Sequence, residues 1–195
     1  LKVGFENITN YTFLSMCNTL KDSTRVGSIL PSDYTRSVAV RQAGGSVQVF
    51  SATLAQDLKF GPVHWDNEVT YQQSSDQVSL PLPKVSLYTN LYFLFPIAKV
   101  LRVQMGGDMS YFTSYYAPDY STTVGQFAVQ DEQNARIKVG NYPIVNVYIN
   151  LHLKNCRLYV AMNHVNQGTG RAFWAPHYPI NPRTFHFGLS WNFFN

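Results

Sequence analysis

The sequence predicts an all-β protein, an antiparallel transmembrane β-barrel, and three observations support this fold class. Apolar and polar residues alternate with a period of two along many segments, which is typical of strands with one apolar and one hydrated face. Charged residues make up only 13% of the 195 residues, whereas aromatic residues reach 15%, and this balance favours β structure in an unusual solvent. Most of the alternating segments are about ten residues long or longer, which is enough for a tilted strand to cross the hydrocarbon layer of a membrane.

About eight strands are predicted, and in chain order they span residues 1–14, 46–60, 63–73, 85–95, 100–115, 144–153, 157–166 and 183–194. We expect them to form a single barrel segment over residues 1–195 that ends in the final barrel strand. No run of about 18 apolar residues occurs, so a transmembrane helix is excluded. The formal net charge of +4 arises from few charges of either sign, and it does not imply a nucleic-acid partner.

The alternation assigns each strand a lipid-facing and a water-facing side. The residues expected to face lipid are Leu101, Val103, Met105, Val147, Ile149, Leu151, Phe187, Leu189 and Trp191. The residues expected to line a pore are Arg102, Gln104, Asp108, His64, Asp66, Glu68, Asn146, Asn150 and His152. Among them Arg102, Gln104 and Asp108 are the best candidates for setting ion selectivity, because charged rings near a constriction bias ion passage. The alternative is that these three side chains only hydrate the lumen and brace each other.

Short and long connections alternate along the chain. Tight turns are predicted at residues 61–62, 96–99 and 154–156, and long polar loops at 15–45, 74–84, 116–143 and 167–182. Short turns on one side and long loops on the other are typical of outer-membrane barrels, in which the turns face the periplasm and the loops face the outside. The pattern therefore predicts a bacterial outer-membrane protein that contacts membrane lipid.

Nine segments carry a family resemblance: Leu1–Tyr11, Ser51–Leu54, His64–Asn67, Ser74–Asp76, Leu80–Pro83, Tyr142–Tyr148, His164–Gly168, Pro176–Arg183 and Gly188–Phe194. Together they resemble the putative porin family of Bacteroidetes outer membranes, and the resemblance spans nearly the whole chain. Since members of that family are longer, the resemblance implies that these residues are the C-terminal portion of a larger barrel. It also implies recognition of the last strand by the barrel-assembly machinery, although Asn195 follows the aromatic Phe194 that would usually end such a strand. The N-terminus lacks a signal peptide, so we expect a processed chain or one whose earlier part is missing.

Strand number separates the possible functions. A barrel of about 16 to 18 strands encloses a water-filled channel, whereas eight strands closed on themselves leave an interior filled by side chains. We therefore expect a porin-like channel for passive diffusion of small solutes. The alternative is a non-conducting structural or binding barrel that packs with other outer-membrane proteins or with itself, as would follow if residues 1–14 paired with the last strand. A third possibility is a soluble barrel or sandwich that buries Val147, Ile149, Leu189 and Trp191 in a dry centre.

Catalysis and cofactors are not expected. The five histidines show no HExxH or comparable metal-binding spacing, and no GxSxG motif is present. His152, His164 and His186 are instead expected to line the wall, and Cys17 and Cys156 to remain free thiols. A set of loop residues could hold a sugar through stacked aromatic rings, with interfacial packing as the alternative: Arg171, Phe173, Trp174, His177 and Tyr178.

Overall fold

The computed structural model describes residues 1–20, 34–130 and 136–193. These residues form strands, turns and loops, and all named strand pairs are antiparallel. None of the described residues belongs to a helix with the length and apolarity needed to span a bilayer. The prediction of an all-β, antiparallel protein is confirmed.

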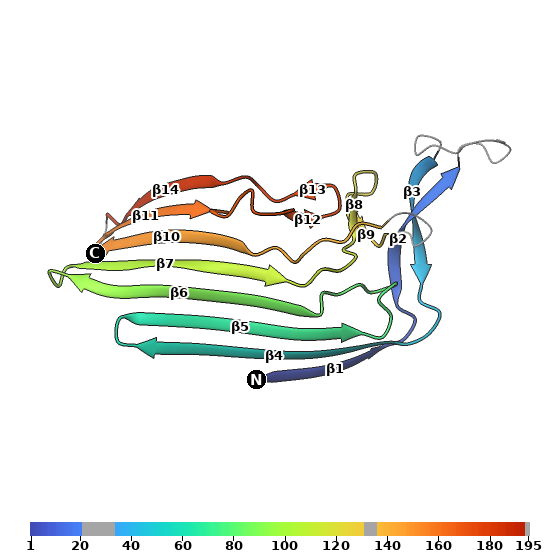
Figure 1. Ribbon diagram of the computed structural model, residues 1–195, viewed down its shortest axis with the longest axis horizontal. Coiled ribbons are helices and arrows are strands. Elements are labelled where there is room, and N and C mark those ends of the chain that lie inside the picture. The colour runs from blue at the N-terminus through green and yellow to red at the C-terminus, as the bar shows by residue number, and fades with distance from the viewer. Residues whose placement is uncertain (21–33, 131–135, 194–195) are drawn as a thin grey trace.

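Eight strands form the main sheet, in the order β1-β4-β5-β6-β7-β10-β11-β14 (Figure 1). Their bounds are Lys2–Ile8 for β1, Val47–Phe60 for β4, Val63–Ser74 for β5, Val85–Ile97 for β6, Leu101–Phe112 for β7, Ile144–Leu153 for β10, Cys156–Asn163 for β11 and Thr184–Trp191 for β14. Each strand lies beside its predecessor in this series, as in an up-and-down meander. The sheet is open, because β1 pairs with β4, β14 pairs with β11, and the two edge strands are not neighbours.

The described strands form an open sheet, so the predicted transmembrane barrel is not confirmed by them. The alternative in which residues 1–14 pair with the last strand is contradicted, because β1 pairs with β4 at the edge of the sheet. The predicted first strand is itself broken. Asn10 has φ 57°, a left-handed conformation that ends an extended segment and that asparagine adopts more readily than most residues.

Three of the predicted long loops contain β-hairpins, which is a second correction. After Asn10, strand β2 (Thr12–Leu20) pairs with β3 (Tyr34–Gln42) in a separate sheet. Strands β8 (Asp119–Ser121) and β9 (Gln126–Ala128) form another pair, as do β12 (Phe173–Ala175) and β13 (Tyr178–Pro179). The strands predicted at 100–115 and 157–166 end earlier, at Phe112 and Asn163. In the second case the next residue, His164, has φ 54° and leaves the extended conformation.

The short turns all lie at one end of the sheet and the long loops at the other (Figure 1). The turns use left-handed residues, which reverse the chain tightly: Gly61 with φ 59°, Ala98 with φ 50°, Lys99 with φ 60° and Lys154 with φ 46°. This arrangement agrees with the alternation of connections in the sequence. We call the two ends of the sheet the turn end and the loop end.

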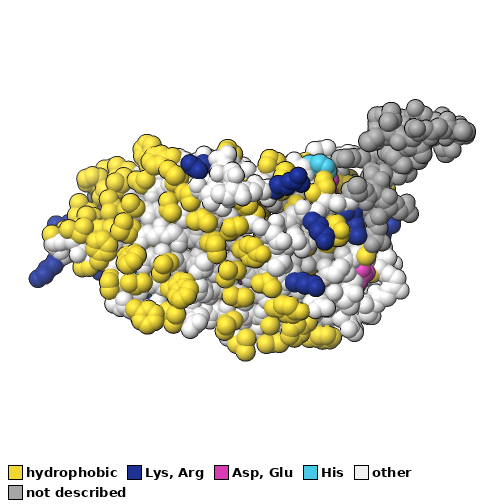
Figure 2. Space-filling model, in the orientation of Figure 1, with side chains coloured by type: hydrophobic (Ala, Val, Ile, Leu, Met, Phe, Trp, Pro, Cys, Tyr) yellow, Lys and Arg dark blue, Asp and Glu magenta, His cyan; other side chains and the backbone are white. Residues whose placement is uncertain are grey.

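The register gives each face of the sheet its chemistry, because directly opposed residues of an antiparallel pair point to the same side. One face, here called the apolar face, carries Val147, Ile149, Leu189 and Trp191, whose exposed fractions are 42%, 40%, 65% and 58%. Hydrophobic side chains spread over the strands on the face seen in Figure 2, while Lys and Arg side chains lie toward its ends. These four side chains therefore do not lie in a dry centre of the described residues.

Most of the strongly buried apolar residues lie at the loop end rather than between two sheets. Val47, Ala117, Ala128, Val139 and Ala175 are each at most 5% exposed, whereas Val103, also 5% exposed, lies near the turn end of β7. The burial of the residues at the loop end shows that the loops pack against one another and against the ends of the strands. The loop end therefore contains a compact core, whereas the apolar face has no covering layer among the described residues.

One row of polar residues interrupts the apolar face. Gln56, Asn67 and Thr89 lie in register on β4, β5 and β6. The Thr89 hydroxyl donates to Asn67 Oδ1 at 2.7 Å, and the indole Nε1 of Trp65 donates to Thr89 Oγ1 at 2.9 Å. These hydrogen bonds satisfy polar groups that would otherwise face an apolar surrounding, and so reduce the cost of placing them there.

Candidate functional site

The opposite face of the sheet, here called the polar face, carries the groups that could interact with solutes. Its centre is a cross-strand row of five residues, Asp57, Asp66, Asn90, Asp108 and Asn146, on β4, β5, β6, β7 and β10. Opposed Cα atoms in antiparallel pairs are about 4.5 to 5.5 Å apart. The register therefore gathers three carboxylates and two amides into one band, which we call the acidic row.

Hydrogen bonds across the strands hold the side chains of the polar face in place. Asn146 Nδ2 donates to Asp108 Oδ2 at 2.8 Å, and Asn150 Nδ2 donates to Gln104 Oε1 at 3.2 Å. The Tyr148 hydroxyl donates to Asn90 Oδ1 at 2.9 Å. Gln104 and Asp108 are thus each held by an amide of β10 rather than by each other.

A basic row lies nearer the turn end. Arg102, His152 and Arg157 are in register on β7, β10 and β11, and both arginines are exposed. They border a cavity of about 430 Å³ together with Gln104 and Asn150. Arg102 and Asp108 are six residues apart on β7, which corresponds to about 20 Å at the rise of a strand. The polar face therefore carries a positive band near its turn end and a negative band near its middle.

The remaining sequence candidates on β5 also point to the polar face. His64 stacks on Tyr92 with ring centroids 4.8 Å apart, and its Nδ1 is buried without a hydrogen-bond partner in the described part of the chain. Asp66 belongs to the acidic row, and Glu68 lies one step closer to the loop end. The register thus places all nine predicted pore-lining residues on one face and all nine predicted lipid-facing residues on the other.

Sequence reasoning missed several polar-face residues, among them Asp57, Asn90 and Arg157. The signal was available, since Asp57 alternates with Leu58 in a predicted strand that leads into a tight turn. Counting back across that turn would have placed Asp57 opposite Asp66.

His164 is not a wall-lining residue. It is buried at the loop end, where its Nε2 contacts the Tyr142 hydroxyl at 2.8 Å and its Nδ1 contacts the Asn181 carbonyl oxygen at 2.7 Å. These contacts show that its role is to fix the loops. His152 and His186 do lie on the polar face.

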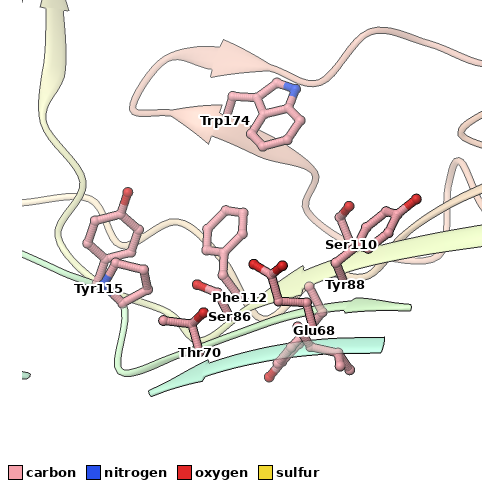
Figure 3. A pocket seen from close by; sticks show the side chains of 11 residues that line it. Glu68, Thr70, Ser86, Tyr88, Ser110, Phe112, Tyr115 and Trp174 are labelled. Carbon is pink, nitrogen blue, oxygen red and sulfur yellow. The ribbon is translucent and has the colours of Figure 1, made fainter. Parts of the chain in front are cut away.

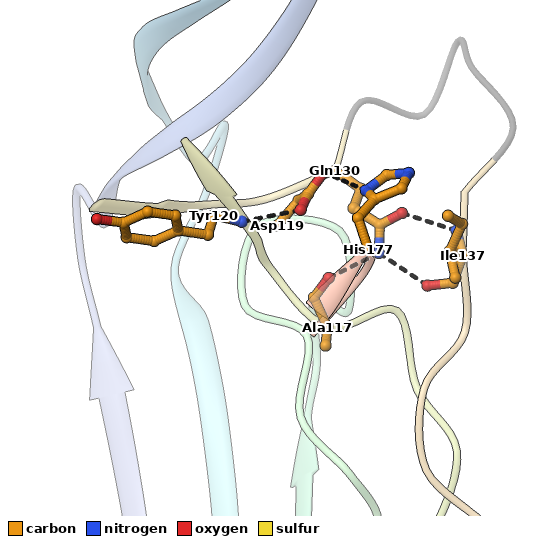
Figure 4. A network of polar contacts seen from close by, with 6 residues as sticks. All are labelled: Ala117, Asp119, Tyr120, Gln130, Ile137 and His177. Atoms are coloured by element: carbon orange, nitrogen blue, oxygen red, sulfur yellow. Dashed lines mark hydrogen bonds and ion pairs between the residues drawn. The ribbon is translucent and has the colours of Figure 1, made fainter. Parts of the chain in front are cut away.

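A polar network fixes the loops to one another at the loop end (Figure 4). The buried Gln130 donates from Nε2 to the carbonyl oxygens of Ala117 and Ile137 at 2.6 and 2.8 Å, and its Oε1 accepts from the Ile137 amide at 2.7 Å. His177 Nδ1 lies 3.2 Å from Asp119 Oδ2, which joins the turn between β12 and β13 to β8. The loops are thus cross-linked by side chains as well as by packing.

Metal and thiol chemistry receive no support from the geometry. Within the residues that the structure describes, no group of three or more His, Cys, Asp or Glu side chains is arranged to hold a metal ion. Cys17 and Cys156 are free thiols, as predicted. What the polar face offers instead is a hydrated surface with two bands of opposite charge.

Comparison with known proteins gives one family match. A family model described as "Putative porin" matches residues 1–195. The match includes every strand of the sheet and all three loop hairpins, so it does not depend on a single motif. No curated protein and no solved structure matches the chain.

Proposed function

Because the chain belongs to the putative porin family, we propose that it forms part of an outer-membrane channel for the passive diffusion of small solutes. In this proposal the apolar face contacts membrane lipid and the polar face lines a water-filled path. The observation that carries the proposal is the separation of the two faces along the whole sheet, with exposed apolar side chains on one side and charged rows on the other. A barrel wall requires this separation, because one side of it contacts lipid and the other side contacts water.

A water-filled path needs more strands than the eight of this sheet. Barrels leave an aqueous lumen at about 16 to 18 strands. The unpaired edges of β1 and β14 are where further strands could be added, and because the number of strands is even the two edges run in opposite directions. We therefore propose that this sheet is the C-terminal portion of a larger barrel of a Bacteroidetes outer membrane.

The remaining partners follow from the same proposal. Membrane lipid covers the apolar face, and the barrel-assembly machinery engages the chain through β14, whose outer edge is unpaired among the described strands. Membership of a porin family favours transport over catalysis. The polar face then acts by hydrating and sorting solutes rather than by forming bonds with them.

Single-channel recording of the native-length protein in planar bilayers tests the proposal. We expect discrete current steps, because a lumen lined by the polar face conducts ions. A barrel that inserts and gives no steps would favour the structural or binding alternative instead. Detergent extraction with a heat-modifiable gel band serves as the control that the protein has inserted and folded.

A further inference from the structure

A pocket of about 370 Å³ lies at the loop end of the polar face, beyond the acidic row (Figure 3). Its floor consists of two cross-strand rows on β5, β6 and β7. The first row is Glu68, Tyr88 and Ser110, and the second is Thr70, Ser86 and Phe112. The floor therefore presents one carboxylate, several hydroxyls and the aromatic rings of Tyr88 and Phe112 to the same space.

An aromatic wall completes the pocket. Trp174 of β12 lies nearly parallel to Phe112, at an interplanar angle of 17° with the ring centroids 6.3 Å apart, and Tyr115 meets Phe112 edge-on at 6.0 Å. Figure 3 shows the indole of Trp174 on one side of the space and the side chains of Glu68, Thr70 and Phe112 on the other. Since 55% of the surface of Trp174 is exposed, its ring remains available to a ligand.

The aromatic wall is held in place by its surroundings. Ala175 and Pro176, which follow Trp174, are buried, and the Ile180 amide donates to the Ala172 carbonyl oxygen at 3.0 Å to close the hairpin. Phe112 rests against Gly140, where a Cβ would lie 3.0 Å from two ring carbons and where φ is 110°. Only glycine fits that position, because the backbone at residue 140 lies directly against the ring of Phe112.

We propose that this pocket is a binding site for a neutral saccharide at the loop-side entrance of the solute path. The inference rests on the proposed function and deepens it by naming a solute class. A sugar ring has an apolar face of C–H groups, which packs on an aromatic ring, and a rim of hydroxyls, which both donate and accept hydrogen bonds. The pocket matches both features, and its volume lies within the usual range of small-molecule sites.

Other ligand classes fit less well. The described residues that line the pocket include no Lys, Arg or His, so an anion would find no counter-charge. An organic cation could pair with Glu68, but a quaternary ammonium group is typically held in a cage of several ring faces. Here Phe112 and Trp174 are nearly parallel and form a platform rather than a cage.

The first experiment measures saccharide binding as interruption of the ion current through the channel. We expect maltotriose, cellotriose or raffinose, added on the loop side, to interrupt the ion current of the native-length channel in a concentration-dependent way. Trp174→Ala should weaken the apparent affinity about tenfold, the usual scale for truncating an aromatic anchor. Trp191→Phe is the matched control, because Trp191 lies at the turn end of the apolar face and should not affect binding.

The second experiment separates saccharide from cation recognition. Glu68→Gln keeps an oxygen that accepts hydrogen bonds and removes the charge, so it should change saccharide affinity by less than about threefold. The proposal would be overturned if choline blocked the native channel but not the Glu68→Gln channel, and if none of the three trisaccharides blocked the native channel. Equal block in Trp174→Ala and the native protein would also overturn it.

The inference can fail independently of the proposed function. Current steps without saccharide block, together with no change in tryptophan fluorescence on adding the trisaccharides to the detergent-solubilised protein, contradict the saccharide site and leave the channel intact. A fluorescence change that disappears in Trp174→Ala, in a protein that gives no current, contradicts the channel and supports the site.

Discussion

Two glycines on the polar face lie so close to neighbouring strands that a side chain would not fit. A Cβ on Gly106 would collide with the Leu91 carbonyl oxygen and with the backbone and Cβ of Tyr92. A Cβ on Gly188 would collide with the ring of Tyr159, which is half exposed and can rotate away. A side chain added at Gly106 would therefore have to displace the backbone of β6. A side chain added at Gly188 would have to displace only the side chain of Tyr159.

This difference predicts unequal effects of one and the same substitution. Gly106→Ala should lower the free energy of unfolding by about 1 to 3 kcal/mol, the usual cost of overpacking, because the backbone of β6 cannot yield. Gly188→Ala should cost less. Urea titration of the folded protein in lipid vesicles, followed by tryptophan fluorescence, measures both, and a larger loss in Gly188→Ala would contradict the assigned contacts.

Asp76 stabilises the loop between β5 and β6. Its Oδ1 accepts hydrogen bonds from the amides of Val78 and Ser79 at 2.9 and 3.1 Å. Burial by itself would raise the pKa of Asp76, but the hydrogen bonds from Ser79 and Val78 outweigh it, so the pKa lies below its ordinary value. A carboxyl with a depressed pKa in the folded state stabilises that state above its unfolded pKa, and this contribution is lost as the pH falls through the folded pKa.

Acid should therefore loosen this loop. Limited proteolysis of residues 75–84 should accelerate as the pH falls below the ordinary range of an aspartate, because the protonated carboxyl holds the two amides less strongly. Asp76→Asn should show the faster cleavage already at neutral pH and a flatter pH profile. If the native protein and Asp76→Asn gave pH profiles of the same shape, a titratable group other than Asp76 would be responsible for the faster cleavage.

At the scale of single elements, β10 offers a direct test of the two faces. Ile149→Arg places a charge on the apolar face and should cost roughly 2 to 4 kcal/mol of unfolding free energy if that position meets the bilayer midplane. Asn150→Arg places the same charge on the polar face and should be far milder, although it removes the hydrogen bond to Gln104. Folding into vesicles under a urea titration compares the two, and equal costs would count against lipid on the apolar face.

The strands also show how far local sequence patterns predict this fold. Seven of the eight strands of the sheet match predicted segments closely, because alternation and turn residues are local signals. The break at Asn10 was missed, since asparagine is compatible with both a strand and a turn. The hairpins β8–β9 and β12–β13 were missed because strands of two or three residues are too short to show a period.

At the scale of the whole molecule, the two charged rows predict opposite effects on ion selectivity. Asp66→Asn together with Asp108→Asn removes negative charge from the acidic row, and should shift the permeability ratio about twofold toward anions. Arg102→Gln removes positive charge from the basic row and should shift it toward cations. Reversal potentials of the native-length channel under a salt gradient measure both, and shifts of the same sign would contradict the placement of the rows along one path.

The matched control for this experiment is Arg171→Gln. Arg171 lies in the loop before β12, outside both rows, so its substitution should leave the reversal potential close to that of the native channel. A shift as large as that of Arg102→Gln would show that loop charges rather than the rows of the sheet set selectivity.

The sequence by itself determined the all-β class, the antiparallel order of the long strands, the face of most candidate residues on those strands and the alternation of turns and loops. These properties depend on residues a few positions apart. The tertiary structure decided the acidic and basic rows, because each depends on the register between strands. It also decided the aromatic pocket, in which Phe112 and Trp174 meet across 62 positions of the chain. Contacts between residues so far apart in the chain arise only when loops fold back over the sheet. No local sequence pattern encodes which residues of the sheet a loop will contact.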